Sequence, residues 1–270
     1  MKFFACMCNQ PQRLAAALEP VRSVLVAQPP VSRWGLGYIQ GGDVLLVRTP
    51  KASAAPIDLA SPLAEIKTDC AIAQAIRDTG EAPSGTDNTP PFRFRRWLFA
   101  QTPTKLDTIA PALLQHVPEY LRRNIRGRTS AELVFHVFLA MLHDEGNIDD
   151  PNLSTAAQRR ALAATIKLVT SELEKAAKAS DTAVDTAMAL GNVALTNGRS
   201  MILAHLSEPL RVRRLTVNND RGEKDDSFRG LLLVSGGDGD PKDGFEDVPP
   251  QRVVLISRDL QLGFADLSAA

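Results

Sequence analysis

Residues 129–144 read TSAELVFHVFLAMLHD, which begins with polar residues suited to cap a helix and continues with a long apolar run. A second segment, residues 155–177, carries apolar side chains at successive intervals of four, three and four, namely Leu162, Ile166, Val169 and Leu173. This spacing places them along one stripe of a helix. A further helix is expected over residues 107–123. The centre of the chain is therefore predicted to be a block of helices.

Strand-like segments lie on both sides of this helical block. Gly41-Gly42 before it and Asn197-Gly198 after it each separate two β-rich runs, as two-residue hairpin turns do. We expect residues 70–77 to pair with residues 94–100, and a helix over residues 14–26. Other apolar runs predict strands at residues 2–8, 210–217, 230–235, 252–257 and 260–264. Strands before and after a helical block indicate an α+β fold, with helices packed on mostly antiparallel sheets.

Composition narrows the class of protein. The 270 residues include 31 Lys and Arg against 31 Asp and Glu, so the formal net charge is zero and nucleic acid is not an expected partner. The longest apolar run, residues 133–142, is much shorter than the roughly 20 residues of a membrane-spanning helix. Three cysteines, at positions 6, 8 and 70, do not make a disulfide framework. We therefore expect a single domain over residues 1–270 in the cytoplasm, with no membrane partner.

The sequence predicts neither a metal site nor a cofactor site. His136 lies within an apolar helical run and is interpreted as a core histidine. Asp238, Asp240 and Asp243 lie in a glycine-bearing loop, but no glutamate follows at the spacing of a calcium-binding loop. We interpret that segment as a solvated loop.

Five short segments follow one another along the chain in a distinctive order. They are Trp34-Gly35, then Arg77 within residues 75–80, NTPPF at residues 88–92, FAQTP at residues 99–103 and TSAE at residues 129–132. Together they resemble the D-G-W-G, H-x-R-x-A-T, N-T-H-P-F, F-A-H-N-G and T-D-S-E motifs of class II glutamine amidotransferases. The resemblance extends over nearly the whole chain.

This resemblance implies an N-terminal-nucleophile hydrolase fold, a four-layer α/β/β/α sandwich of two antiparallel sheets between helical layers. In such enzymes a cysteine at position 2, exposed when Met1 is removed, attacks the side-chain amide of glutamine, and its own α-amino group is the base. Here position 2 is Lys2, whose amine is protonated at neutral pH and whose length disfavours removal of Met1. Cys6 lies about 13 Å further along a strand, too far to replace it.

Other positions of the family's site differ as well. The resemblance implies that Arg77, which is retained, binds the α-carboxylate of glutamine. The asparagine and glycine that form the family's oxyanion hole are replaced here by Thr102 and Pro103. Proline has no N–H to donate, and losing one oxyanion donor costs about two to three orders of magnitude in rate. The aspartate that would hold the substrate ammonium falls on Ser130. We therefore predict a retained fold with a vestigial pocket and no catalytic residue.

The vestigial pocket is expected to be built from the start of the first strand and from the five segments: Lys2, Trp34, Gly35, Arg77, Asn88, Thr89, Gln101, Thr102 and Ser130. We expect a protein without glutaminase activity that holds a protein partner or a small anionic ligand, the latter through Arg77. One alternative is an active glutamine amidotransferase or amide hydrolase with an unrecognised nucleophile. A second is nucleic-acid binding through the segment from Arg93 to Trp97, where basic and aromatic residues alternate.

Overall fold

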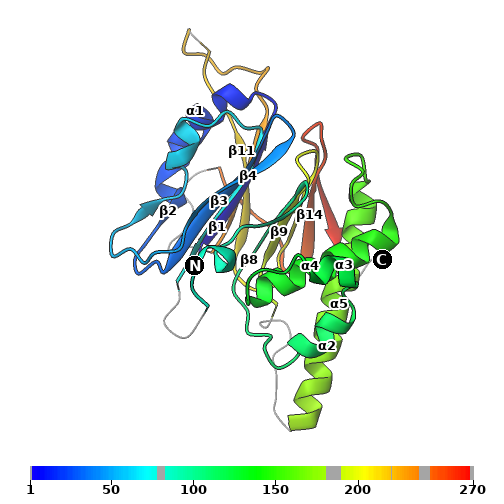
Figure 1. Ribbon diagram of the computed structural model, residues 1–270. Coiled ribbons are helices and arrows are strands. Elements are labelled where there is room, and N and C mark those ends of the chain that lie inside the picture. Colours follow the sequence, from blue (N-terminus) through cyan, green and yellow to red (C-terminus); the bar gives the residue numbers. More distant parts are fainter. Residues whose placement is uncertain (1, 78–82, 181–189, 220, 237–243, 268–270) are drawn as a thin grey trace.

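Two antiparallel sheets stand beside one another in the computed structural model, which describes residues 2–77, 83–180, 190–219, 221–236 and 244–267 (Figure 1). The larger sheet has the strand order β13-β11-β12-β1-β6-β3-β4. Its strands are β1 (Lys2–Cys8), β3 (Arg33–Gln40), β4 (Asp43–Thr49), β6 (Cys70–Ile76), β11 (Leu210–Leu215), β12 (Gly230–Ser235) and β13 (Glu246–Asp247).

The smaller sheet has six strands in the order β15-β14-β10-β9-β8-β7. They are β7 (Phe92–Phe94), β8 (Trp97–Gln101), β9 (Val193–Thr196), β10 (Met201–Ala204), β14 (Arg252–Ile256) and β15 (Leu262–Asp266). A separate two-stranded ribbon joins β2 (Val26–Ala27) to β5 (Ile57–Asp58).

An apolar layer fills the space between the two sheets. In β1, Phe3, Ala5 and Met7 point into this intersheet layer, whereas Phe4 and Cys6 belong to the core on the outer face of the large sheet. This alternation follows from the two-residue period of a strand. Because both faces of β1 are covered, residues 3–8 of the strand are all apolar.

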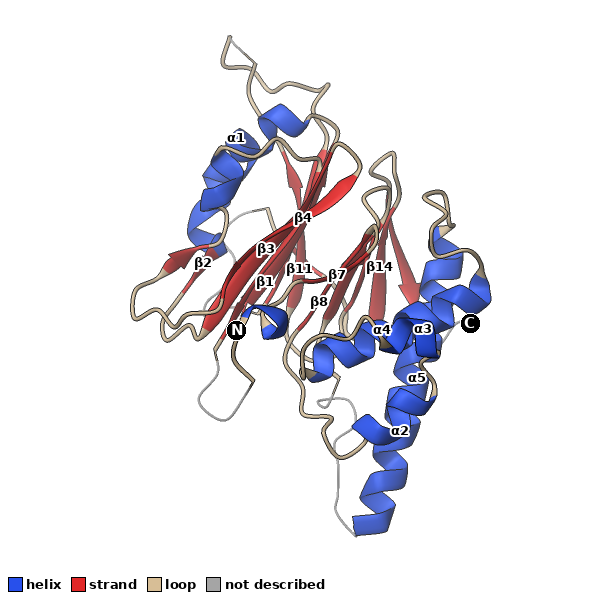
Figure 2. Ribbon diagram, in the orientation of Figure 1, coloured by secondary structure: helices blue, strands red, loops and turns tan. Residues whose placement is uncertain are grey.

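Helices cover the outer faces of both sheets (Figure 2). The small sheet is covered by α4 (Ser130–Glu145) and α5 (Thr155–Ser180), with α2 (Ala110–Gln115) and α3 (Glu119–Arg122) beside them. Phe135 of α4 stacks on Phe99 of β8 at a centroid distance of 5.0 Å. The large sheet is covered by α1 (Leu14–Leu18) and the 3-10 helices Pro11–Arg13, Glu19–Leu25 and Ser61–Ala64; another, Thr86–Asn88, precedes β7. The expected four-layer α/β/β/α arrangement is confirmed.

Proline explains where two expected helices differ from the structure. The helix expected over residues 14–26 is α-helical only to Leu18 and then continues as a 3-10 helix, because Pro20 lacks the N–H that the next α-helical turn requires. The helix expected over residues 107–123 divides into α2 and α3, and Pro118 lies between them at the N-cap of α3.

One expected strand pair was wrong. Residues 70–77 and 94–100 do not pair: β6 lies between β1 and β3 of the large sheet, whereas β8 lies between β7 and β9 of the small one. In addition, the segment from Arg93 to Trp97 is not one strand, because Arg95 has a φ of 51° and turns the chain from β7 into β8. Both β6 and β8 are buried on both faces, so the sequence of neither strand shows which sheet it joins.

Candidate functional site

Polar side chains gather at the end of the intersheet layer where β1 begins. Phe3 lies between Gln74 of β6 and Ser235 of β12, so all three side chains point toward the small sheet. On that sheet, Thr102 follows β8 and Asn192 precedes β9. All four polar residues are at least 98% buried. We call Gln74, Thr102, Asn192 and Ser235 the mouth cluster.

Asn192 ties the two sheets together. Its amide donates to Ser235 Oγ at 2.8 Å and to the carbonyl of Glu208 at 2.6 Å. Its Oδ1 accepts from the backbone N–H groups of Leu206 and Ser207 at 2.7 and 2.9 Å. One buried side chain therefore fixes the connection from β10 to β11 against β12.

Gln74 makes a second link between the sheets. Its Nε2 donates to the carbonyl of Gln101 at 2.6 Å, but its Oε1 is buried and has no hydrogen-bond partner. Gln101 itself points to the helical side of β8, like Trp97 and Phe99, and both atoms of its amide are buried without a partner. Buried polar groups are normally hydrogen-bonded, so these unpaired amide atoms are unusual.

The segment after β8 is closed by the chain before β9. The backbone N–H of Thr102 donates to the carbonyl of Asn192 at 2.9 Å, and the next residue is Pro103, which has no N–H. A Cβ on Gly191 would lie 2.0 Å from Thr102 Oγ1, so only glycine permits this approach. Thr102 Oγ1 is buried without a hydrogen-bond partner.

The cysteines are remote from reagents in solution. Cys6, Cys8 and Cys70 are all buried and none forms a disulfide. Burial raises the pKa of Cys8 to about 11 and that of Cys70 to about 12, and it raises the pKa of Cys6 well above its ordinary value. At the start of β1, the backbone of Lys2 pairs with Ala75 of β6.

Arg77 and Trp34 do not join the mouth cluster. Arg77 follows β6 and donates from Nε and Nη2 to the carbonyl of Gln28, at 3.0 and 2.9 Å, and from Nη2 to that of Pro29 at 3.4 Å. Trp34 packs on the core of the outer face of the large sheet. The sequence placed both residues in the pocket, but the structure places their side chains against the outer layer.

Two motif residues instead support the loop that leads into α4. Asn88 Oδ1 accepts from the N–H of Arg128 at 2.7 Å. Glu132 accepts from the N–H groups of Arg126 and Gly127 at 3.0 and 2.7 Å, although burial raises its pKa. A Cβ on Gly127 would lie 2.5 Å from the Asp87 carbonyl and 2.7 Å from both Asn88 Oδ1 and Glu132 Oε2. These contacts give the retained asparagine and glutamate a structural role.

The remaining motif residues also make local contacts. Thr89 is buried and donates to the carbonyl of Gly85 at 2.9 Å. Ser130 Oγ accepts from the N–H of Leu106 at 3.1 Å. Gly35 is required by close approach, since a Cβ there would lie 2.4 Å from the Pro90 carbonyl. Of the nine expected pocket residues, Lys2, Gly35, Gln101 and Thr102 lie at or beside the mouth cluster, Gly35 as the cross-strand partner of Gln74.

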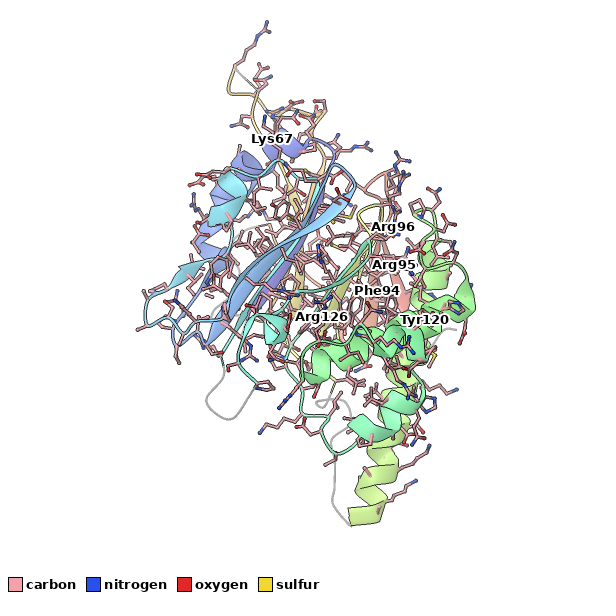
Figure 3. All side chains as sticks on the ribbon, viewed as in Figure 1. Lys67, Phe94, Arg95, Arg96, Tyr120 and Arg126 are labelled. Carbon is pink, nitrogen blue, oxygen red and sulfur yellow. The ribbon has the colours of Figure 1, made fainter. Side chains whose placement is uncertain are left out.

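The segment expected to bind nucleic acid in the second alternative has no free aromatic face. Phe92, Phe94 and Trp97 are all buried, and Trp97 donates to the carbonyl of Ile148 at 2.9 Å. Figure 3 shows Arg95 and Arg96 at the turn of this hairpin, near Tyr120. Arg95 forms an ion pair with Asp149. This geometry lacks the stacking platform on which single strands are bound.

Within the described ranges, no three His, Cys, Asp or Glu side chains are arranged to hold a metal ion. The loop residues Asp238, Asp240 and Asp243 lie outside the described residues. None of the helices in the described part of the chain combines the length and the apolar character needed to cross a bilayer. His136 is a buried core histidine, with Nδ1 2.9 Å from the Glu132 carbonyl.

Similar solved structures share this architecture. Neither models of protein families nor curated protein sequences match the chain. A glutamine aminotransferase class-II domain protein from Silicibacter pomeroyi superposes with a TM-score of 0.61 at 15% identity, over 99% of this chain and all of that one. The glutamine phosphoribosylpyrophosphate amidotransferase of B. subtilis superposes with a TM-score of 0.54 at 12% identity. The chain has the class II glutamine amidotransferase fold.

The coverage of these structures shows how much of each protein shares the fold. The B. subtilis amidotransferase is covered over only 50% of its length, whereas this chain is covered completely. A predicted glutamine amidotransferase from Pseudomonas aeruginosa PA01 superposes with a TM-score of 0.51 at 13% identity, over 97% of this chain and 99% of that one. At such low sequence identity these similar structures establish only the fold. What the site can do chemically depends on its own residues.

Sequence reasoning missed most of the mouth cluster. Gln74, Asn192 and Ser235 lie in apolar strands or at their ends and belong to none of the five motifs. A polar residue within an apolar strand, such as the glutamine of CAIAQAI in β6, is the one local signal that could have identified them. Their convergence depends on the pairing of distant strands.

Proposed function

We propose that this chain is a binding module with the class II glutamine amidotransferase fold, and that it does not hydrolyse glutamine. The observation that carries the proposal is the hydrogen bonding at Thr102 and Pro103. The only backbone N–H of the pair is donated to the Asn192 carbonyl, so neither residue has a backbone N–H for a developing oxyanion. These two residues therefore give no backbone stabilisation to the negatively charged oxygen of the tetrahedral intermediate that forms when an amide is attacked.

The cysteines support the same proposal. Thiols attack as thiolates, and a raised pKa reduces the thiolate fraction at neutral pH. All three thiols have raised pKa values because they are buried, and Cys6 and Cys70 are completely enclosed. None of them combines access to substrate with nucleophilic reactivity.

The mouth cluster supports a binding role. Gln74 Oε1 and Thr102 Oγ1 are buried without partners, and leaving such groups unpaired costs about 1–3 kcal/mol each. A small polar molecule that pairs with either atom would remove this cost. We favour such a ligand over a protein partner, because atoms enclosed between two sheets are out of reach of a flat protein surface.

The test is an ammonia-release assay on the purified protein with glutamine, with an active class II amidotransferase as the positive control. We expect no ammonia above background. We also expect no labelling of Cys6, Cys8 or Cys70 by 6-diazo-5-oxonorleucine, a glutamine analogue that alkylates reactive thiols, as read by intact mass. Ammonia release that Cys6→Ala abolishes would show instead that the chain is an active amidotransferase.

A further inference from the structure

β4 is a long edge strand of the large sheet. Among the described strands it pairs only with β3, over seven successive residue pairs without a bulge. Proteins usually protect a sheet edge by making it short or bulged, or by placing lysine or proline in it. The other edges of the two main sheets are shorter, since β13 has two residues, β7 three and β15 five. β4 has seven residues and contains neither lysine nor proline.

Two hydrophobic side chains of β4 are exposed to solvent. Leu45 is 36% exposed and Val47 is 37% exposed, and they are two of the four large hydrophobic side chains exposed in the described part of the chain. Both lie on the outer face of the sheet, because Val44 and Leu46 belong to the intersheet layer. A long, apolar, unpaired edge is a template on which another strand can pair.

The hairpin geometry shows which backbone groups of β4 are free. Asp43 directly follows the two-residue turn, so it exchanges both hydrogen bonds with β3, and every second residue after it does the same. The N–H and C=O groups of Val44, Leu46 and Arg48 therefore point away from β3. The Val44 carbonyl accepts from Arg93 at 2.8 Å. The outward groups of Leu46 and Arg48 have no partner among the described residues.

Only one symmetric register uses these groups without conflict. A two-fold axis at Val47 places Leu46 opposite Arg48 of a second copy, and each such pair exchanges two hydrogen bonds. Pro50, which has no N–H, then lies opposite Val44, whose carbonyl is already occupied. An axis at Leu46 would direct the N–H of Arg48 at that occupied carbonyl. An axis at Arg48 would place Leu46 opposite the proline.

Charges beside the strand favour the same register. Lys51 lies two residues beyond the end of β4, and the axis at Val47 brings it opposite Asp43 of the second copy. Both charged side chains are exposed, and neither forms an ion pair within the described residues. The two-fold axis creates this contact of opposite charges twice.

We propose that the chain forms a homodimer in which β4 pairs antiparallel with β4 of a second copy, so that the two large sheets become continuous. Val47 meets its own copy at the axis, and Leu45 meets Thr49 on the outer face. A contact through one strand of each copy is smaller than the roughly 1,600 Å² of a standard interface, so we expect a Kd on the order of 10 μM. The dimer does not depend on a ligand at the mouth cluster.

Cysteine cross-linking tests the register. Residues that face each other in a non-hydrogen-bonded pair have Cα atoms about 4.5 Å apart, a distance that a disulfide can span. We expect Val47→Cys to form a covalent dimer under mild oxidation, as read by non-reducing gel electrophoresis and intact mass. Leu45→Cys is the matched control, because it is as exposed but its two copies lie about 13 Å apart along the strands. The native cysteines are buried and should not react.

Sedimentation velocity from about 1 to 200 μM measures the association of the wild type and its variants. Val47→Lys should weaken association by about tenfold or more, because two lysines would meet at the axis. Tyr120→Lys is the control and should have no effect, since Tyr120 is 41% exposed but lies on α3. Lys51→Asp should also weaken association, and combining it with Asp43→Lys should restore it. Thermal unfolding of each variant checks that it folds.

The dimer is refuted if the wild type stays monomeric up to about 200 μM. Equal cross-linking of Val47→Cys and Leu45→Cys would reject the register. Equal weakening by Val47→Lys and Tyr120→Lys would place the contact on another surface, and failure of the charge exchange to restore association would remove the contact between Asp43 and Lys51. The ammonia-release assay is independent of all these measurements, so the dimer and the proposed function can fail separately.

Discussion

Replacing Asn192 with alanine tests the link between the two sheets. The substitution removes four side-chain hydrogen bonds, two donated to Glu208 O and Ser235 Oγ and two accepted from the N–H groups of Leu206 and Ser207. Each buried group left without its partner costs about 1–3 kcal/mol. Taking the low end for each of the four groups, we expect Asn192→Ala to lower the free energy of unfolding by about 4 kcal/mol. That is a large part of the roughly 5–15 kcal/mol of a typical protein.

Urea unfolding followed by tryptophan fluorescence and far-UV circular dichroism measures this change. Ser235→Ala is the matched control, because it removes only the bond from the Asn192 amide to Ser235 Oγ and should cost about 1 kcal/mol. The loss of unfolding free energy in Asn192→Ala should be about four times that in Ser235→Ala. If Asn192→Ala and Ser235→Ala destabilise equally, or if Asn192→Ala costs less than about 1 kcal/mol, Asn192 does not hold the sheets together.

Two further predictions concern the helical side of the small sheet. Burial lowers the pKa of His136, so the unfolded chain takes up a proton below about pH 6.5 while the folded chain does not. The free energy of unfolding should therefore fall by up to about 2 kcal/mol from pH 7.5 to pH 5. His136→Leu should flatten this part of the pH profile. Equal slopes in the wild type and the variant would show that His136 does not cause the fall. Gly127→Ala should cost about 1–3 kcal/mol in urea unfolding, because its Cβ would approach the Asp87 carbonyl to 2.5 Å. Gly263→Ala is the control, since its nearest neighbour is 3.9 Å away and it should be close to neutral; similar losses in both would contradict the steric argument.

The sequence was sufficient wherever a local pattern has one structural meaning. The caps and apolar stripes predicted α4 and α5, and Thr129 does accept a hydrogen bond from the N–H of Glu132 at the N-cap. Gly41 and Gly42 have positive φ angles in the turn between β3 and β4, as the hairpin signal required. The order of the five motif segments indicated the four-layer architecture.

Local sequence patterns could not predict which distant strands pair with one another. The strands β6 and β8 are apolar on both faces, so the sequence could not say which sheet each joins, and the expected pairing between them was wrong. The same limit applies to the site. Arg77 matches a motif, yet its hydrogen bonds are with Gln28 and Pro29, whereas Gln74 and Asn192 match no motif and lie at the mouth.

The sequence alone determined which groups this chain has: capped helices, two hairpin turns that contain glycine, Lys2 at the start of the first strand, and Pro103 without an N–H. Tertiary structure alone decided where those groups act. Helix and turn formation depends on neighbours a few residues apart, so it can be predicted from short stretches of sequence. The mouth cluster joins residues 74, 102, 192 and 235, whose proximity exists only because burial of apolar faces packs the two sheets against each other.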